Sequence, residues 1–151
     1  MDSLPGDFNL LSNLFYQFSN HVVPDKEKIT FGSHSYVRGY SNYHIASNKG
    51  FASNFELSKM FMVKNTYLRS VRPYVFFDYG KILNKKDVKN SISSVSSIGL
   101  GLSGSIIGLL NFKLDFAKPL KAVPIKDKIS NKTVKQKKLQ TVFSVEHKVE
   151  W

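Results

Sequence analysis

Residue types that often carry catalysis are present in this chain, but their spacing assembles no catalytic or metal site. None of the four histidines has the i, i+4 helical spacing or the carboxylate neighbours of a metal ligand: His21, His34, His44 and His147. Cysteine is absent, which excludes a disulfide framework and a thiolate metal site. Serine is frequent, yet no Gly-x-Ser-x-Gly segment marks a nucleophile elbow. We therefore expect no enzyme activity, no cofactor and no bound metal.

The positive charge of the chain is concentrated in one segment. The formal net charge is +11 over 151 residues, and eight lysines lie between Lys118 and Lys138 with only Asp127 against them. A strongly basic chain favours nucleic acid or an anionic membrane surface as its partner. No expected strand interleaves aromatic and basic side chains as a base-stacking platform does. We therefore interpret the lysines as a solvated loop and expect no nucleic-acid partner.

Apolar and polar residues alternate along most of the chain, and this period of two predicts an all-β fold. In the segment LLNFKLDFAK, for example, Leu110, Phe112, Leu114 and Phe116 alternate with residues that are mostly polar. Six strands are expected, over residues 8–18, 54–63, 71–82, 95–103, 109–117 and 139–151. Their lengths are close to the roughly 9 to 11 residues of a tilted strand that crosses a membrane.

The connections between the expected strands alternate in length. Short turns join the second strand to the third and the fourth to the fifth, whereas the other connections are long and polar. This arrangement is typical of an outer-membrane β-barrel, with short periplasmic turns and long extracellular loops. A soluble antiparallel β-sandwich also alternates apolar with polar residues, so both folds stay open at this point. No apolar run reaches the roughly 18 to 20 residues of a membrane helix, which excludes a helical membrane protein.

Two short motifs connect the chain to a known family. The loop motif Val37, Arg38, Gly39, Tyr40 is followed about forty residues later by Phe76, Asp78 and Gly80 in the segment FFDYG. Together they resemble the paired motifs of the two-partner secretion transporters, the haemolysin secretion/activation family of Gram-negative outer membranes. The resemblance implies the C-terminal six strands of a larger, sixteen-stranded antiparallel transmembrane barrel. Complete members also have a signal peptide and periplasmic transport-associated domains, and we expect neither in this chain.

The same resemblance implies a contact between the two motifs. Asp78 lies on the opposite side of its strand from Val75 and Phe77, so it points into the barrel lumen if those residues meet lipid. In the family, the loop folds back into the barrel and its arginine pairs with this aspartate; here these residues are Arg38 and Asp78. Glu56, on the second expected strand, is another candidate lumen partner for Arg38.

The expected function is transport without catalysis. The resemblance implies translocation of a secreted exoprotein of the haemolysin or adhesin class, in the bacterial outer membrane, among lipid and lipopolysaccharide. It also implies recognition by the outer-membrane assembly machinery, whose sorting signal ends on an aromatic residue; Trp151 and Val149 are the candidates here. Trp151 also fits a residue of the interfacial aromatic girdle.

Two other interpretations stay open from the sequence. A barrel segment of the related outer-membrane protein assembly family shares the loop arginine motif. A soluble basic β-sandwich acting as a binding module is the third. In either barrel interpretation we expect the chain to be the C-terminal part of a larger barrel and not a working pore alone, because six strands leave two open edges in lipid.

Overall fold

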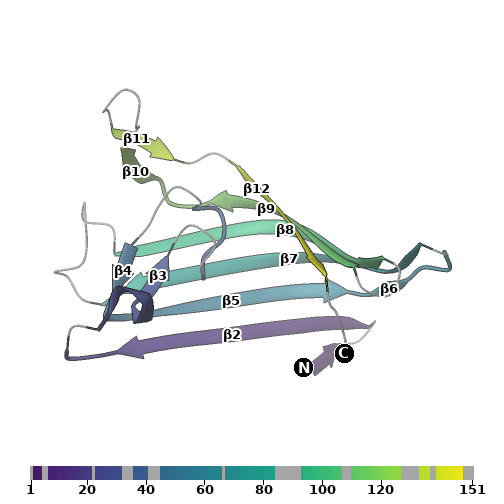
Figure 1. Ribbon diagram of the computed structural model, residues 1–151, viewed down its shortest axis with the longest axis horizontal. Coiled ribbons are helices and arrows are strands. Elements are labelled where there is room, and N and C mark those ends of the chain that lie inside the picture. Colours follow the sequence, from purple (N-terminus) through teal and green to yellow (C-terminus); the bar gives the residue numbers. More distant parts are fainter. Residues whose placement is uncertain are drawn as a thin grey trace.

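The described part of the chain forms one large antiparallel β-sheet with two small sheets beside it, as seen in a computed structural model (Figure 1). The structure describes residues 2–4, 7–21, 23–31, 36–40, 45–65, 67–83, 93–106, 110–126, 133–136 and 139–147. The alternating sequence pattern accounts for the sheet, because a period of two gives each strand one apolar face. The all-β antiparallel fold predicted from the sequence is confirmed.

Within the described residues, the main sheet has eight strands. They are β1 (Asp2–Leu4), β2 (Phe8–Phe18), β5 (Lys49–Lys59), β6 (Phe61–Met62), β7 (Leu68–Ile82), β8 (Ser94–Ile106), β9 (Leu110–Pro119) and β12 (Gln140–His147). The strand order is β1-β2-β5-β7-β8-β9-β12, with β6 also paired to β7. No helix in the described part of the chain is long and apolar enough to cross a membrane.

The two small sheets are hairpin-like additions within the long connections. β3 (Ile29–Phe31) pairs with β4 (Ile45–Ser47), and β10 (Val123–Lys126) pairs with β11 (Thr133–Gln136). A single turn of 3-10 helix, η1 (Asp25–Glu27), precedes β3. The lysine-rich connection between β9 and β12 is therefore not a plain loop, since it contains the β10–β11 pair.

The second strand differs from its predicted range of 54–63. The strand begins at Lys49, five residues earlier than predicted. The alternation of apolar and polar residues is hard to recognise at this start because the residues there are small, although Ala52 is fully buried. The strand ends at Lys59, and the short β6 follows after Met60. The interruption falls beside Pro73 of β7, which has no N–H to give to the ladder.

The other strands lie close to their expected ranges. The first strand spans 8–18 as expected, and the short β1 pairs with it. The strand expected over 71–82 begins earlier and spans 68–82, the one expected over 95–103 is longer at both ends and spans 94–106, and the one expected over 109–117 is shifted to 110–119. The last strand, expected over 139–151, is described for 140–147, and the rest of that range lies outside the described residues.

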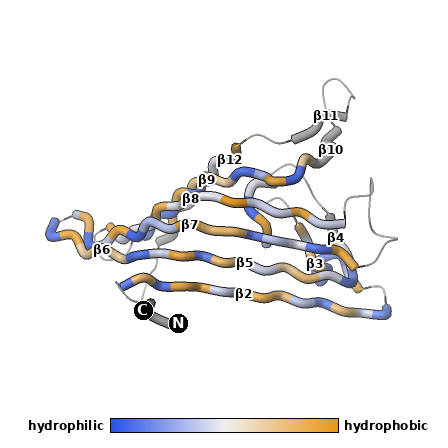
Figure 2. The backbone as a smooth tube through the Cα atoms, turned by 180° about the vertical axis from the view of Figure 1, so that it is seen from behind, coloured by the Kyte–Doolittle hydropathy of each residue, from blue (hydrophilic) through white to orange (hydrophobic). Residues whose placement is uncertain are grey.

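The two faces of the main sheet have opposite chemistry. One cross-strand row, Leu10–Leu57–Val75–Leu100–Phe116, consists of large apolar side chains that are 36 to 61% exposed. We call this the outer face; Figure 2 shows apolar residues recurring along its strands. The opposite face, which we call the inner face, carries mostly polar and small side chains. Residues 29–31 and 36–40, which we call the covering segment, pack against it.

The hydrophobic core lies between that covering segment and the inner face. Ile29, Phe31, Val37 and Tyr40 from the covering segment form one buried cluster with Ala52, Ile82 and Val95 of the sheet. The cluster sits at the end of the sheet where the long connections leave, which we call the loop end (Figure 1). The opposite end, where β6 and the short connection from β8 to β9 lie, is the turn end. The core therefore fixes residues 36–40, which carry the loop motif and are called the motif loop from here on, at the loop end of the inner face.

Candidate functional site

Two glycines allow the motif loop to lie directly on the sheet. Gly39 has a φ of 90°, a backbone conformation that side chains rarely adopt, and a Cβ there would lie 3.2 Å from Cβ of Ala117. A Cβ at Gly80 would lie 2.7 Å from the ring of Phe31 and 3.0 Å from Val37. The absence of side chains at these two positions brings the loop backbone within reach of the side chains on β7.

The side chains of Arg38 and Asp78 are in direct contact. Nε of Arg38 donates to Oδ2 of Asp78 at 2.8 Å, and Nη2 donates to Oδ1 at 2.9 Å. The backbone N–H of Arg38 also donates to Oδ2, at 3.0 Å. Asp78 is fully buried. The contact is a bidentate guanidinium–carboxylate pair with a third, backbone hydrogen bond, so it holds the loop as well as the side chain.

Two more carboxylates surround the same guanidinium. Nη1 of Arg38 lies 3.4 Å from Oε2 of Glu56 and 3.4 Å from Oδ1 of Asp115. The candidate partner Glu56 is thus near Arg38, but at a longer distance than Asp78. Asp115 on β9 is a third acidic neighbour, which the sequence analysis missed because nothing in the motifs links β9 to the loop. We call Arg38, Glu56, Asp78 and Asp115 the arginine cluster.

An aromatic ring completes the environment of the guanidinium. Cζ of Arg38 lies 3.5 Å from the centroid of the Phe76 ring, a close cation–π contact. Tyr74, two residues earlier on the same face, donates from its hydroxyl to Oδ1 of Asp115 at 2.7 Å. Phe76 therefore contacts Arg38 directly, whereas Tyr74 orients one of the surrounding carboxylates.

The electrostatics of the arginine cluster keep Arg38 charged. Burial by itself disfavours the charged form, but the hydrogen bonds and charge of Asp78, with the charges of Asp115 and Glu56, raise the pKa of Arg38 above its ordinary value. Removing one partner of such a buried pair leaves the other charge without compensation, at a cost of about 3 to 5 kcal/mol. Loss of either Arg38 or Asp78 is therefore expected to release the loop.

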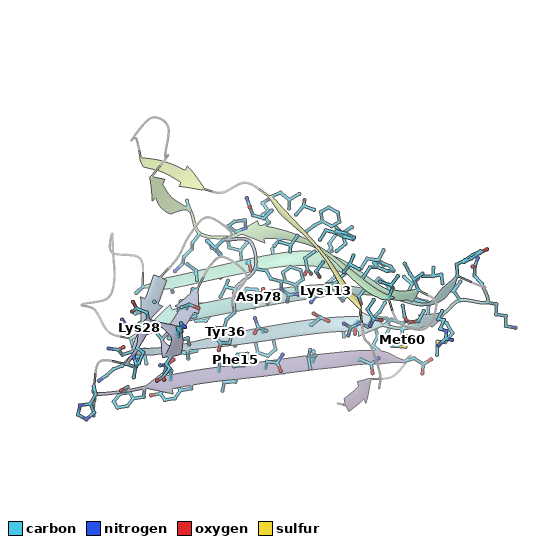
Figure 3. All side chains as sticks on the ribbon, viewed as in Figure 1. Phe15, Lys28, Tyr36, Met60, Asp78 and Lys113 are labelled. Atoms are coloured by element: carbon cyan, nitrogen blue, oxygen red, sulfur yellow. The ribbon has the colours of Figure 1, made fainter. Side chains whose placement is uncertain are left out.

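Asn54 on β5 connects the cluster to the loop backbone. Its Nδ2 donates to the carbonyl of Tyr36 at 2.6 Å and to Oδ1 of Asp78 at 3.0 Å. Asn54 is the register partner of Asp78 across the β5–β7 ladder, and this pairing is the signal that could have located it. The ring of Tyr36 also packs on Phe15 of β2, with 4.4 Å between centroids (Figure 3).

Tyr40 makes a second attachment between the loop and the sheet. Its hydroxyl lies 2.7 Å from the carbonyl of Ser96 and 3.1 Å from that of Lys121, and both backbone N–H groups approach it at 3.3 Å. Burial raises the pKa of Tyr40, although these backbone hydrogen bonds act in the opposite direction. The hydroxyl of Tyr40 therefore joins the loop to β8 and to the segment after β9, whereas the ring of Phe76 packs against the guanidinium of Arg38.

The remaining sequence-based candidates separate into two groups. Val149 and Trp151 lie outside the described residues, as do His34 and His44. Phe76, Asp78 and Gly80 all face the motif loop, with Val37 and Gly39 packed against the sheet. Among the residues that the structure describes, no group of three His, Cys, Asp or Glu side chains is arranged to hold a metal ion.

Arg72 is a further cation near the cluster that the sequence analysis did not single out. Its Nη2 lies 3.3 Å from Oε1 of Glu56, close enough for an ion pair, although this oxygen accepts no hydrogen bond. Nε of Arg72 donates to Oγ of Ser103 at 3.2 Å. Arg72 is two strand positions before Tyr74 and faces the same side, which is the pattern that identifies it.

Comparison with known proteins identifies the family. The family model of the haemolysin secretion/activation proteins ShlB/FhaC/HecB matches residues 2–104 of the chain, a range that contains both motifs. Neither a curated protein nor a solved structure matches the chain. The antiparallel sheet agrees with the β-barrel of this family. The chain therefore belongs to the haemolysin secretion/activation family, which consists of two-partner secretion transporters of the outer membrane.

Proposed function

We propose that this chain contributes the C-terminal part of an outer-membrane barrel that secretes and activates an exoprotein of the haemolysin or adhesin class. The observation that carries the proposal is the bidentate contact between Arg38 and Asp78 on the inner face. In a closed barrel this face lines the lumen, so a loop held there by the arginine cluster occupies the transport path. The motif loop is then an inward-folded plug tip and not a surface excursion.

Membrane insertion of the sheet is part of the same proposal. The outer face exposes a continuous row of apolar side chains. Contact of this row with water is energetically unfavourable, whereas contact with lipid is favourable. β1 and β12 lie at the two edges of the described sheet. An open edge in lipid leaves backbone groups unpaired, so further strands must complete the barrel in a working transporter. The chain is accordingly proposed as one part of a pore, which does not function alone.

The alternatives from the sequence are less well supported. The family match names secretion and activation proteins and not the outer-membrane assembly family. A soluble β-sandwich requires a second sheet over the apolar face, and within the described residues the two small sheets are too short for that role. No specific observation favours a second function.

A secretion assay tests the proposal. In a complete barrel that includes this chain, Arg38→Ala and Asp78→Ala should each reduce the amount of exoprotein released into the medium. Because both changes break the same Arg38–Asp78 contact, the double variant should reduce secretion by no more than the sum of the two single reductions. Lys81→Ala and Asp25→Ala are the matched controls, since both side chains are exposed and outside the cluster. Normal secretion by both single cluster variants would refute the proposed role.

A further inference from the structure

A groove on the inner face lies between the arginine cluster and the turn end of the sheet. Its volume is about 370 Å³, within the usual range for ligand sites. It is lined by Met60, Ser70, Arg72, Ser103, Gly104, Ser105, Asn111, Phe112, Lys113 and Ser144. Figure 3 shows Lys113 and Met60 on the side of Asp78 that faces β6. We call this the turn-end groove.

Among the described residues that line the turn-end groove, all charged side chains are positive. They are Arg72 and Lys113, and the other polar residues described there have hydroxyl or amide side chains. Both cations have a carboxylate neighbour away from the groove: Glu56 lies 3.3 Å from Arg72, and Asp115 lies 3.8 Å from Lys113. These contacts leave the side chain of Lys113 42% exposed and that of Arg72 27% exposed. The groove therefore favours an anionic ligand with further polar groups.

The two cations lie in one cross-strand row. Arg72 pairs with Ser103, Ser103 with Lys113, and Lys113 with Ser144. Neighbouring strands are about 4.8 Å apart, so the backbones at Arg72 and Lys113 are separated by about 10 Å. Two negative groups with a similar separation would be able to reach both cations at once.

An unfolded polypeptide can supply that separation. In the polyproline II conformation, which unfolded chains populate, the repeat is three residues and the rise is about 3.1 Å per residue. Acidic side chains three residues apart then project on the same side, about 9 Å from each other. The hydroxyl and amide groups of the groove can meanwhile exchange hydrogen bonds with the backbone between them, which a single inorganic anion would not use.

We propose that the turn-end groove binds an extended polypeptide segment with two carboxylates three residues apart, held by Arg72 and Lys113. The inference rests on the proposed function, in which an exoprotein passes along the inner face, and it adds that the exoprotein enters as an extended chain from the end with the short turns. The groove is then a contact point for the exoprotein before it reaches the arginine cluster. Of the arginine cluster, Glu56 and Asp115 lie beside the two cations, whereas Arg38 and Asp78 do not line the groove.

The test is a peptide-binding measurement on the whole chain in a non-ionic detergent. The probe is a fluorescent, acetylated and amidated peptide, Gly-Ser-Asp-Gly-Ser-Asp-Gly-Ser, and its matched control carries Asn in place of both Asp residues. Fluorescence anisotropy should show that the Asp peptide binds more tightly than the Asn peptide. Lys113→Gln should weaken binding of the Asp peptide about tenfold, the effect of losing one charge-assisted hydrogen bond.

The control variant is Lys118→Gln. Lys118 lies on the same strand but on the outer face, so its loss should leave peptide binding unchanged. Equal binding of the two peptides, or equal losses in the Lys113 and Lys118 variants, would overturn the proposal. Displacement of the peptide by inorganic phosphate at equal concentration would also overturn it, because the site would then be one for simple anions. The secretion assay with Arg38 and Asp78 bears on the proposed function separately, since neither residue lines the groove.

Discussion

At the residue scale, the arrangement around Arg38 gives its neighbours unequal importance. Asp78 accepts three hydrogen bonds from Arg38 at 2.8 to 3.0 Å, whereas Glu56 and Asp115 lie 3.4 Å from the guanidinium. Asp78 is also fully buried, so no water can replace a lost partner. The attachment of the loop is therefore expected to depend on Asp78 more than on the other two carboxylates.

The first prediction concerns this order of importance. Asp78→Asn should lower the free energy of unfolding, measured by urea titration of the chain in phospholipid vesicles, by about 3 kcal/mol, because Arg38 is left without its close charged partner. Asp25→Asn, at an exposed i, i+3 ion pair with Lys28, is the control and should cost less than about 1 kcal/mol. Equal losses in the two variants would contradict the assignment of Asp78 as the main partner.

The second prediction concerns Tyr40 and pH. Tyr40→Phe removes a hydroxyl that binds Ser96 and Lys121, so it should cost about 1 kcal/mol at neutral pH. The folded-state pKa of Tyr40 is raised, so its contribution is fully present below the ordinary tyrosine pKa of about 10 and is lost as pH rises through the raised value. The difference in unfolding free energy between wild type and Tyr40→Phe should thus shrink above pH of about 10.

The exposed Tyr67 supplies the control for the second prediction. Tyr67→Phe leaves the protein with the same number of tyrosines as Tyr40→Phe, but it removes no contact of the motif loop. Its unfolding free energy should follow that of the wild type at every pH. A constant difference between Tyr40→Phe and wild type across this pH range would show that the hydroxyl does not anchor the loop.

At the scale of elements, β8 provides the space in which two aromatic rings of β7 lie. A Cβ on Gly99 would be 2.3 Å from Cζ of Phe76, and one on Gly101 would be 2.0 Å from Cζ of Tyr74. Phe76 contacts Arg38, and Tyr74 holds Asp115. The small residues of β8 thus position the arginine cluster through the rings of the neighbouring strand.

The third prediction follows from this packing. Gly99→Val should force the ring of Phe76 away from Arg38, displace the backbone oxygen of Phe116 on β9, and lower the free energy of unfolding by about 1 to 3 kcal/mol. Ser105→Val is the control, because Ser105 lies on the same strand and face but beside the open turn-end groove. Urea titrations of both variants in vesicles provide the measurement. A Gly99→Val protein as stable as Ser105→Val would mean that the ring has room to move.

Sequence alternation located the strands well where large apolar residues mark one face, as on β9 and on the first part of β12. It failed at the start of β5. Gly50 and Ala52 face the covering segment, which leaves room only for small residues there, so the alternation of large apolar and polar residues is absent. The two motifs identified Arg38 and Asp78, but motifs alone do not reveal cross-strand neighbours. Asn54, Asp115 and Arg72 become visible only once the register of the ladders is known.

At the scale of the whole molecule, the two faces of the main sheet determine where the chain can reside. The outer face exposes a row of large apolar side chains, and the inner face holds the buried ionic cluster. The fourth prediction is that the folded chain is recovered with membranes after cell lysis and is released only by detergent. Recovery of a folded monomer from the soluble fraction without detergent would contradict both the barrel interpretation and its outer-membrane location.

Arg38 holds the motif loop against the inner face through its contact with Asp78. The chain has no cysteine, so the reactivity of a single introduced cysteine can show whether the motif loop covers the inner face. Ser97 is fully buried beside Asp78 on β8, whereas Ser103, on the same face, borders the open groove. Ser97→Cys and Ser103→Cys are therefore a matched pair for labelling with a water-soluble maleimide.

The decisive measurement is the labelling rate of each cysteine variant in vesicles, with Arg38 present and with Arg38→Ala. Ser97→Cys should be protected when Arg38 is present and should react at least tenfold faster in the Arg38→Ala background. A loss of about 1.4 kcal/mol in the free energy that holds the loop on the sheet already corresponds to a tenfold higher labelling rate. Ser103→Cys should react at the same rate in both. An unchanged, slow rate for Ser97→Cys after the loss of Arg38 would contradict the account.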